Sequence, residues 1–355
     1  MIYAVLMAGG RGTRLWPISR RGSEKHLLST SGGSLLLETF ERIAEAVPAE
    51  RVRIVTTQDQ SDSVASQLAD KIAYDQIIAE PLARGTAAAL AHASMRLARG
   101  DPDPVVIALP CDHLITRTDD FIQSLGAGLK YLAKNDVFVT FGVKPDAPRT
   151  GFGYIVAGGR LDTPLGAVYK AARFVEKPDG ETAARLLSSG GVYWNSGMFL
   201  FRARTYMNAL KAHLPAHHDA FMEIFKSFGS RTEEQTILSR YQALESVSVD
   251  RGVMEKADNV VVVEATFDWR DVGSHDALPG LQEAESANRA KGDFVALDAT
   301  GCSAWTDAGV VALVGVKDVT VVRCGDAVLV CGNDALQRVR DVVALLEKRG
   351  LTDYL

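Results

Sequence analysis

The residues with the clearest chemical potential lie in a glycine-rich segment near the start of the chain. Its glycines are Gly9, Gly10 and Gly12. They follow an apolar run, Ile2–Met7, which predicts a buried strand; open α/β sheets bind ligands at the carboxyl ends of such strands. Glycines let backbone N–H groups close around an anion, and Arg14, Arg20 and Lys25 would neutralise it. This pattern predicts a binding site for the phosphates of a nucleotide.

Two familiar phosphate loops do not fit this segment. A P-loop ends in Gly-Lys-Ser/Thr, which is missing here, and a dinucleotide fingerprint needs a third glycine where this chain has Leu15. A purely structural tight turn is the plain alternative. The cations in and after the turn argue against that alternative, because a structural turn has no need of them.

Carboxylates form a second group with chemical potential. Asp112 directly follows the apolar run Val105–Leu109, and Asp268 and Asp271 lie together much later in the chain. A carboxylate at the end of a central strand is placed to hold Mg²⁺, or Mn²⁺, because these hard cations take oxygen ligands. An isolated aspartate at such a place would more simply cap a turn. Spacing alone leaves open whether Asp268 or Asp271 would share the ion with Asp112.

Strand and helix patterns alternate through the first two-thirds of the chain and would position these groups. The apolar, β-rich runs are Ile2–Met7, Val52–Thr57, Val105–Leu109, Val137–Val143 and Met198–Phe201. The helical patterns lie near Leu35–Ala46, Ala87–Arg99 and Phe121–Ala133. This alternation predicts the α/β class, with a doubly wound, mostly parallel, Rossmann-like sheet.

The pattern changes near residue 290. Short apolar runs then alternate with glycines, at Phe294–Leu297, Val310–Val316, Val319–Val322 and Ala327–Val330. A helical pattern, Asp334–Lys348, follows and is capped by Gly350. We therefore expect two domains, residues 1–285 and a small β domain with a C-terminal helix, residues 286–355. So small a domain leaves apolar strand edges, which predicts a two-fold homodimer; a monomer with these strands packed on the main domain is the alternative.

Composition narrows the classes of function. The 355 residues carry a formal net charge of −5, which offers no face for a polyanion, so nucleic acid is not an expected partner. The four cysteines lack zinc-ligand spacing and are expected to be reduced core residues. The sequence shows neither a basic leader nor an apolar stretch of about 18 residues, so we expect a cytoplasmic protein without membrane contact.

Several segments between residues 1 and 280 resemble the sugar-1-phosphate nucleotidylyltransferases, in particular their mannose-1-phosphate guanylyltransferase branch. Residues 9–17 match that family's Gly-Gly-x-Gly-Thr-Arg-Leu-x-Pro, followed by a lysine at Lys25 whose neighbours differ from the family's. Matching segments follow, in the family's order, at residues 80–86, 109–113, 150–155, 174–178, 193–199, 248–256 and 267–274. The resemblance also suggests a short left-handed β-helix for the last domain.

The resemblance implies a set of site residues. Nucleotide contacts would come from Leu6, Ala8, Gly9, Gly10, Gly12, Thr13, Pro81, Gly85 and Thr86. Sugar contacts would come from Gly153, Glu176, Lys177, Asn195 and Asp250, catalytic cations from Arg14, Lys25 and Lys177, and metal ligands from Asp112 and Asp271. Thr86 also suits the N-cap of a helix that starts at Ala87.

Three further positions depart from the family's pattern. Gly85 replaces an asparagine beside the base, which removes an amide, and Arg251 replaces a tyrosine, which removes an aromatic wall near the sugar. His275 replaces a tryptophan. Because Mg²⁺ prefers oxygen, we expect His275 to be a surface residue or a neighbour of the metal site rather than a ligand.

The resemblance implies transfer of GMP from GTP to α-mannose 1-phosphate, giving GDP-mannose and diphosphate. An anionic phosphate oxygen can attack the α-phosphorus in line without a protein nucleophile, provided that charge is neutralised and the groups are aligned. Another base, hexose or heptose remains an alternative, and so does a non-catalytic sensor of nucleotide sugars. A glycosyltransferase would need an Asp-x-Asp metal pair, for which only Asp101 and Asp103, among prolines, are at hand.

Overall fold

The structure is a computed structural model that describes residues 1–355 apart from 11, 21–23, 29–32, 162–166, 279–280 and 285. Arg11 of the glycine segment and residue 285 at the expected domain boundary therefore lie outside the described residues. The chain divides into two compact units. The larger unit comprises Met1–Gly9, Thr39–Cys111 and Ile115–Trp269; the smaller comprises Gly10–Glu38, Asp112–Leu114 and Arg270–Leu355. The division into domains 1–285 and 286–355 stays a prediction, but compactness groups two early segments with the end of the chain.

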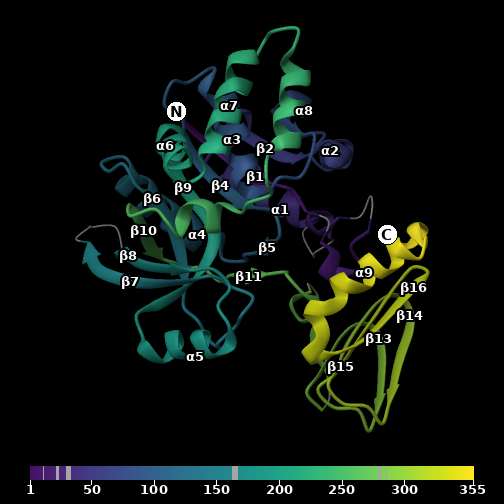
Figure 1. The fold of residues 1–355 in the computed structure, drawn as a ribbon. Helices are drawn as coiled ribbons and strands as arrows, with labels where there is room; N and C mark the ends of the chain where they lie inside the picture. Colours follow the sequence, from purple (N-terminus) through teal and green to yellow (C-terminus); the bar gives the residue numbers. More distant parts are fainter. Residues whose placement is uncertain (11, 21–23, 29–32, 162–166, 279–280, 285) are drawn as a thin grey trace. The chain divides into compact units, whose positions relative to one another are not determined.

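A nine-stranded sheet organises the larger unit (Figure 1). Its strands, in spatial order, are β3 (Ile77–Glu80), β2 (Val52–Thr57), β1 (Ile2–Met7), β4 (Val105–Pro110), β9 (Val192–Arg202), β6 (Phe138–Val143), β10 (Val260–Glu264), β8 (Val168–Val175) and β7 (Tyr154–Leu161). The first four strands pair in parallel, and β6 pairs with β10 in parallel. Only β8 and β9 run against the other strands. The predicted mostly parallel α/β sheet is confirmed.

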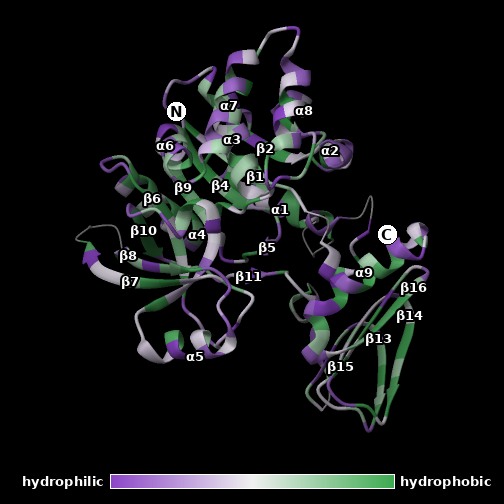
Figure 2. Ribbon diagram, viewed as in Figure 1, coloured by the Kyte–Doolittle hydropathy of each residue, from purple (hydrophilic) through white to green (hydrophobic). Residues whose placement is uncertain are grey.

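The central strands are buried on both faces, as their unbroken apolar runs predict. In β4, the successive residues Val106, Ile107 and Ala108 have no exposed surface, although neighbouring side chains point to opposite faces. One face packs against α3 (Gly85–Ala98), and α4 (Thr118–Leu132) packs against β6, β9 and β10. Figure 2 shows the hydrophobic colour concentrated on these central strands.

The remaining helices of the larger unit surround this core. They are α2 (Ser61–Gln67), α5 (Gly180–Ser189), α6 (Ala203–His213), α7 (Pro215–Ser227) and α8 (Glu233–Ala243), while the residues of α1 (Leu35–Ala44) are divided between the two units. Three strand predictions for this sheet differ in extent. The expected strand at Val105–Leu109 extends to Pro110. The expected strand at Val137–Val143 begins one residue later, and the run Met198–Phe201 is the end of the eleven-residue β9.

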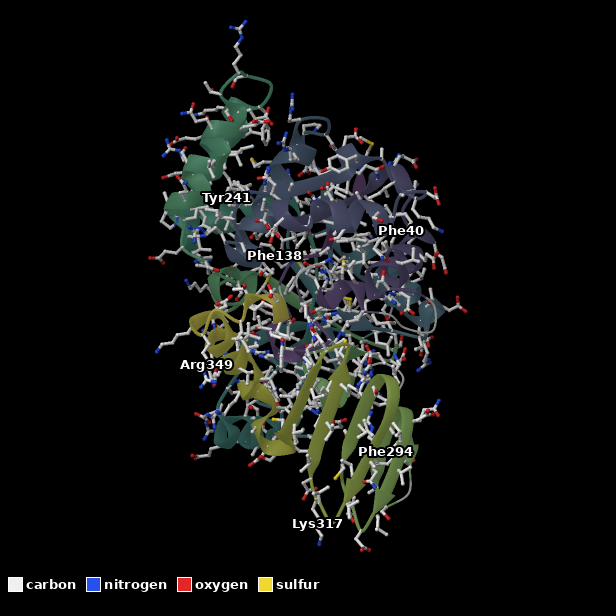
Figure 3. All side chains as sticks on the ribbon, turned by 90° about the vertical axis from the view of Figure 1, so that its right-hand side faces the viewer. Phe40, Phe138, Tyr241, Phe294, Lys317 and Arg349 are labelled. Carbon is white, nitrogen blue, oxygen red and sulfur yellow. The ribbon has the colours of Figure 1, made fainter. Side chains whose placement is uncertain are left out.

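The end of the chain coils into a small β-helix. Its strands are β12 (Gln282–Ala284), β13 (Asn288–Leu297), β14 (Ser303–Val314), β15 (Val319–Cys324) and β16 (Ala327–Gly332). Successive strands β13, β14 and β15 pair in parallel without an intervening helix, which is the pattern of a coil, and β16 folds back antiparallel. Inside it lie small and branched residues such as Cys302, Ala304, Val311 and Leu313. Phe294 and Lys317 mark this coil in Figure 3.

A short helix completes the smaller unit. The expected helix at Asp334–Lys348 is a 3₁₀ turn at Asn333–Arg338 followed by α9 (Val339–Lys348). None of the helices in the described part of the chain combines the length and the apolar character needed to cross a bilayer. All four cysteines are free, and two of them, Cys111 and Cys302, are buried.

Candidate active site

The glycine segment begins where β1 ends. Leu6 and Ala8 have no exposed surface. The Ala8 N–H donates to the Val55 carbonyl (2.9 Å), and the Ala8 carbonyl accepts from the Thr56 hydroxyl (2.6 Å). Gly9 and Gly10, by contrast, are exposed. The larger unit therefore offers backbone donors to a ligand at Gly9 rather than at Ala8.

Gly12 lets the segment of the smaller unit fold tightly. Its φ of 58° lies in the left-handed region, and a Cβ there would approach the Cβ of Lys25 and the Oγ of Ser19 to 2.7 Å. A 3₁₀ turn at Thr13–Leu15 follows directly, with Thr13 and Arg14 half-buried. The glycine is thus needed both for its backbone conformation and for the close passage of Lys25.

Three charged residues from separate segments meet in the smaller unit. The two-residue strands β5 (His113–Leu114) and β11 (Arg270–Asp271) pair antiparallel, which brings Asp271 opposite His113. Lys25 Nζ donates to Asp112 Oδ2 at 2.5 Å and to Asp271 Oδ1 at 3.0 Å. The cation and both carboxylates that were singled out in the sequence are therefore in direct contact.

The electrostatics of this site favour the charged forms of Lys25 and Asp112. Burial by itself would lower the pKa of Lys25, but the charges of Asp112 and Asp271 outweigh it and raise that pKa. Burial would likewise raise the pKa of Asp112, yet Lys25 and His113 hold it well below its usual range. Lys25 is consequently an ammonium and Asp112 a carboxylate throughout the neutral pH range.

The structure distinguishes the two late aspartates. Asp268 belongs to the larger unit, where its carboxylate accepts hydrogen bonds from the backbone N–H groups of Thr116 (3.0 Å) and Arg117 (2.8 Å). Asp271 instead shares Lys25 with Asp112. Spacing left this choice open, and the geometry groups Asp271 rather than Asp268 with Asp112.

The side chains of Asp112, His113 and Asp271 together offer ligand atoms for a divalent cation. One ligand atom each from Asp112, His113 and Asp271 lies within 4.8 Å of the others. Two carboxylates offer the oxygen ligands that Mg²⁺ and Mn²⁺ accept, and the ammonium of Lys25 already occupies a cationic position between them. His113 Nε2 lies 3.6 Å from Asp112 Oδ1, so the ring neighbours one of the carboxylates.

A second cluster lies in the larger unit, around Gly153. A Cβ on this buried glycine would come within 2.4 Å of Glu176 Oε2 and 3.3 Å of the Asn195 Cβ, so glycine is the residue that fits there. The Glu176 side chain is only 6% exposed and accepts from Lys177 Nζ at 2.5 Å. Lys177 has a φ of 50°, a left-handed conformation that is uncommon for a residue with a side chain.

Asn195 and Asp250 complete this cluster. Asn195 Nδ2 donates to Asp250 Oδ1 at 2.8 Å, while Asn195 Oδ1 accepts from the Thr140 hydroxyl at 3.1 Å. Burial and the nearby charge of Glu176 raise the pKa of Asp250 to about 6. Two carboxyl groups, an amide and an ammonium thus gather at Gly153, a set that can accept hydrogen bonds from hydroxyl groups and meet a phosphate.

The segment of residues 80–86 is held by the last turn of α8 and by the residues that follow that helix. The Arg84 guanidinium donates to the Tyr241 carbonyl (2.7 Å), and the Val247 N–H donates to the Arg84 carbonyl (3.2 Å). Gly85 has a φ of +80°, and a Cβ there would lie 2.4 Å from the Val247 oxygen. The approach of Val247 explains why this chain has glycine where the family has asparagine.

The expected N-cap role of Thr86 was wrong, and so was one of the two alternatives for His275, a surface position. Helix α3 begins at Gly85, so Thr86 lies inside its first turn and is not the N-cap; its hydroxyl accepts from the Val249 N–H at 2.8 Å. His275 is not a surface residue, because it has no exposed surface and its Nε2 lies 3.1 Å from the Trp16 carbonyl. In both cases a backbone group distant in sequence takes up the polar side chain.

Two residues of the Gly153 cluster, Thr140 and Glu255, were not predicted from the sequence. Thr140 orients the Asn195 amide, and Glu255 Oε1 accepts from the Glu176 N–H at 2.7 Å. Thr140 has no exposed surface and interrupts the apolar run of β6, which is the signal that could have identified it. Glu255 lies in the segment 248–256, which resembles the family, but no neighbouring residue in the sequence indicates its contact with Glu176.

The acids of the rival Asp-x-Asp pair have structural partners. Asp101 forms an ion pair with the amino group of Met1, and Asp103 lies 3.0 Å from an Arg202 nitrogen. Neither belongs to the group of potential metal ligands among the described residues. A glycosyltransferase that uses this pair is therefore disfavoured.

Comparisons with known proteins show which family the chain belongs to. Residues 3–288 match the family model of the nucleotidyl transferases, and residues 292–346 match that of the mannose-phosphate isomerase/GMP-like β-helix domain. The xanthan biosynthesis protein XanB of Xanthomonas campestris is 37% identical over 99% of this chain and 74% of its own length. A mannose-1-phosphate guanylyltransferase of Klebsiella pneumoniae is 36% identical over all of this chain and 76% of its own. The chain thus spans about three-quarters of the length of these curated relatives.

A solved structure shows the same fold over nearly the whole chain. It is described as a mannose-1-phosphate geranyltransferase from Thermus thermophilus and is 37% identical, with a TM-score of 0.84. The superposition covers 98% of this chain and 99% of that one. The similarity therefore includes the β-helix, the part of the sequence that had offered no specific motif.

Proposed function

The chain belongs to the nucleotidyl transferase family, among its mannose-1-phosphate guanylyltransferases, and we propose that it transfers GMP from GTP to α-mannose 1-phosphate. The products are GDP-mannose and diphosphate. The observation that carries this proposal is the meeting of Lys25 with Asp112 and Asp271, three residues from distant segments that form a site for phosphates and a divalent cation.

The reaction needs charge neutralisation and alignment rather than a protein nucleophile. An anionic oxygen of the sugar phosphate forms a bond to the α-phosphorus of GTP, while the bond from that phosphorus to the β-phosphate oxygen breaks. The electron pair of the broken bond leaves with diphosphate. Arg14 and Lys25 would neutralise the charge that grows on the leaving group, since Lys25 stays protonated, and Gly9, Gly10 and Gly12 would donate backbone N–H groups.

Asp112 and Asp271 would hold Mg²⁺, or Mn²⁺, which supplies further neutralisation of the phosphates when bound. Glu176, Asn195 and Asp250 would accept hydrogen bonds from the hydroxyl groups of the hexose, and Lys177 would orient its phosphate. Pro81, Gly85 and Thr86 would lie against the base, and Thr13 would contribute through the glycine segment. Leu6 and Ala8, which are fully buried, would support that segment from the end of β1. Lys177 Nζ also forms a salt bridge with Glu176 Oε1 at 2.5 Å, so the group for the phosphate and the group for the hydroxyls lie side by side.

Two further properties belong to this proposal. We place the reaction in the cytoplasm, where GTP is made and used. We also propose that the enzyme is a homodimer, because large aliphatic side chains of the β-helix, such as Val310 and Val314, are 60% and 64% exposed. A second copy of the same face would cover them.

The proposal is tested by crossing five nucleoside triphosphates with several sugar 1-phosphates and measuring diphosphate release with Mg²⁺. We expect the highest kcat/KM for GTP with α-mannose 1-phosphate. A preference for another pair would assign a different member of the family, which the departures at Gly85 and Arg251 make worth examining. No diphosphate from any pair would favour a nucleotide-sugar sensor.

A further inference from the structure

Residues 10–38, here called the phosphate segment, pack together with the β-helix in one compact unit. The smaller unit joins Gly10–Glu38, which carries Arg14 and Lys25, to the β-helix and α9 in one compact body. Its core contains Leu15, Trp16, Ile18 and Leu28 from that segment together with Val322, Ala327, Leu329 and Val339 from the end of the chain. The residues on either side of Lys25 are therefore packed against the last domain.

Arg20 makes the polar part of this connection. Its guanidinium donates to the Pro17 carbonyl at 3.0 Å, to the Cys324 carbonyl at 2.9 Å and to Asp326 Oδ1 at 2.7 Å. Cys324 ends β15, and Asp326 lies in the turn before β16. Arg20, which the sequence pattern grouped with the phosphate-binding cations, is thus bonded to the β-helix instead.

Trp16 makes a second connection to the end of the chain. Its indole N–H donates to the Tyr354 carbonyl at 2.7 Å, and the Trp16 carbonyl lies 3.1 Å from His275 Nε2. His275 lies four residues after Asp271. Trp16 consequently links the glycine segment both to the last residues of the chain and to the strand end that carries the second carboxylate.

We propose that Arg20 is a positioning residue for catalysis, and that the β-helix is a brace that holds Lys25 against Asp112 and Asp271. This inference rests on the proposed function. Lys25 lies between two anchored points, Arg20 and the buried Leu28, so a displacement of either would shift its ammonium. An error of about 1 Å in the position of a catalytic group can lower the rate about a hundredfold.

Arg20 contacts the β-helix through an ion pair with Asp326 and through a hydrogen bond to the neutral carbonyl of Cys324. Asp326 is 64% exposed, and exposed ion pairs contribute little by themselves. The Arg20 side chain is only 18% exposed, and its planar fork serves three acceptors that a lysine could not reach together. We therefore expect the position of the phosphate segment to depend on the planar geometry of the Arg20 guanidinium rather than on its charge.

The test compares Arg20→Lys with a matched control, Arg323→Lys. Arg323 also binds an aspartate, Asp307 at 3.1 Å, and a carbonyl, that of Ala308 at 2.6 Å, but both partners lie within the β-helix. We expect Arg20→Lys to lower kcat at least about tenfold while KM for the sugar phosphate changes less than about twofold. Arg323→Lys should stay within about twofold of the wild type in both constants.

Other variants guard against misfolding and against indirect effects. Trp16→Phe keeps the aromatic ring in the core but loses the bond to Tyr354, and it should lower kcat several-fold in a fully folded protein. Asp326→Asn should have a small effect alone and add nothing to Arg20→Lys, because both act through one contact. Circular dichroism and thermal unfolding confirm that each variant is folded.

The outcomes separate this inference from the proposed function. If the wild type releases diphosphate but Arg20→Lys matches it in kcat, the brace is refuted and the proposed function stands. An equal loss in Arg323→Lys would also refute it, because the effect would then be one of general stability. A wild type that is inactive with every substrate pair would instead refute the proposed function, on which the inference depends.

Discussion

The ammonium of Lys25 lies 2.5 Å from Oδ2 of Asp112 and donates a hydrogen bond to it. The same nitrogen also reaches Asp271, so one cation bridges two carboxylates that stand 159 positions apart in the chain. Two carboxylates this close repel each other unless a cation lies between them. Lys25 meets this need in the structure, and a divalent cation would meet it during the reaction.

Replacement of either carboxylate by an amide should abolish most activity. We expect Asp112→Asn and Asp271→Asn each to lower kcat/KM by about a thousandfold, since a lost metal ligand removes several kcal/mol of transition-state stabilisation. Activity should disappear with EDTA and return with Mg²⁺ or Mn²⁺. Asp268→Asn is the matched control, because its carboxylate contacts Thr116 and Arg117 instead. Near-full activity in Asp271→Asn with none in Asp268→Asn would reverse our assignment.

The cations of the glycine segment and the Gly153 cluster should respond differently to substitution in steady-state kinetics. Lys25→Ala and Arg14→Ala should lower kcat about a hundredfold, because these cations meet charge that develops on the leaving group. Glu176→Gln should instead raise KM for the sugar phosphate at least about tenfold, the usual cost of a lost hydrogen bond to a charged group. Glu181→Gln, at a 92% exposed position nearby in the chain, is the control. An unchanged KM in Glu176→Gln would exclude its role in holding the sugar.

Folding stability should fall as the pH rises above neutrality, because of Glu80. This side chain is 5% exposed and accepts from the Tyr241 hydroxyl at 3.1 Å, in α8, where Figure 3 labels Tyr241. Burial raises the pKa of Glu80 to about 8. A carboxyl group with a raised pKa in the folded state binds its proton more tightly there than in the unfolded chain. The stability that Glu80 contributes to the fold is therefore complete below its unfolded pKa and is lost by about pH 8.

The effect of Glu80 on stability can be measured without a contribution from histidine between about pH 6.5 and 8.5. Burial lowers the pKa of His92, whose Nδ1 lies 3.0 Å from the Tyr241 hydroxyl, to about 3, so His92 destabilises the fold only below its unfolded pKa. Urea unfolding should show a loss on the order of 1–2 kcal/mol across this window, and Glu80→Gln should flatten the curve. Glu234→Gln, at an exposed position of α8, should keep the wild-type slope. A slope that persists in Glu80→Gln would assign it to another group.

The exposed aliphatic face of the β-helix should mediate dimer formation. Leu297 of β13 and Val314 of β14 are paired neighbours and are 60% and 64% exposed. Light scattering should give a dimer at micromolar concentration, and Val310→Lys combined with Val314→Lys should give a folded monomer. Leu345→Lys, at an exposed position of α9, should remain dimeric. A monomeric wild type would rule the dimer out.

Point variants are a better test of the dimer than removal of residues 286–355. Such a truncation would uncover Leu15, Trp16 and Leu28, whose core partners include Val322 and Leu329. It would therefore disturb the phosphate segment whatever the oligomeric state. Activity and dimer formation can be separated only by changes on the outer face of the coil.

The sequence by itself determined the elements and the residue types at their ends. Apolar runs marked Ile2–Met7 and Val52–Thr57 at the bounds that the structure has, because buried parallel strands must be apolar on both faces. Glycines and cations after the first strand, and an aspartate after Val105–Leu109, indicated phosphate and metal chemistry through properties that are local in the chain.

Only the tertiary structure decided which of these residues meet. It grouped Asp271 rather than Asp268 with Asp112, bonded Arg20 to the β-helix, and placed Thr86 inside a helix with the Val249 N–H as its partner. Propensity and periodicity act over a few residues, whereas these contacts join groups up to about three hundred residues apart. Their partners depend on how whole elements pack, and that packing minimises the free energy of the folded chain as a unit rather than of any one segment.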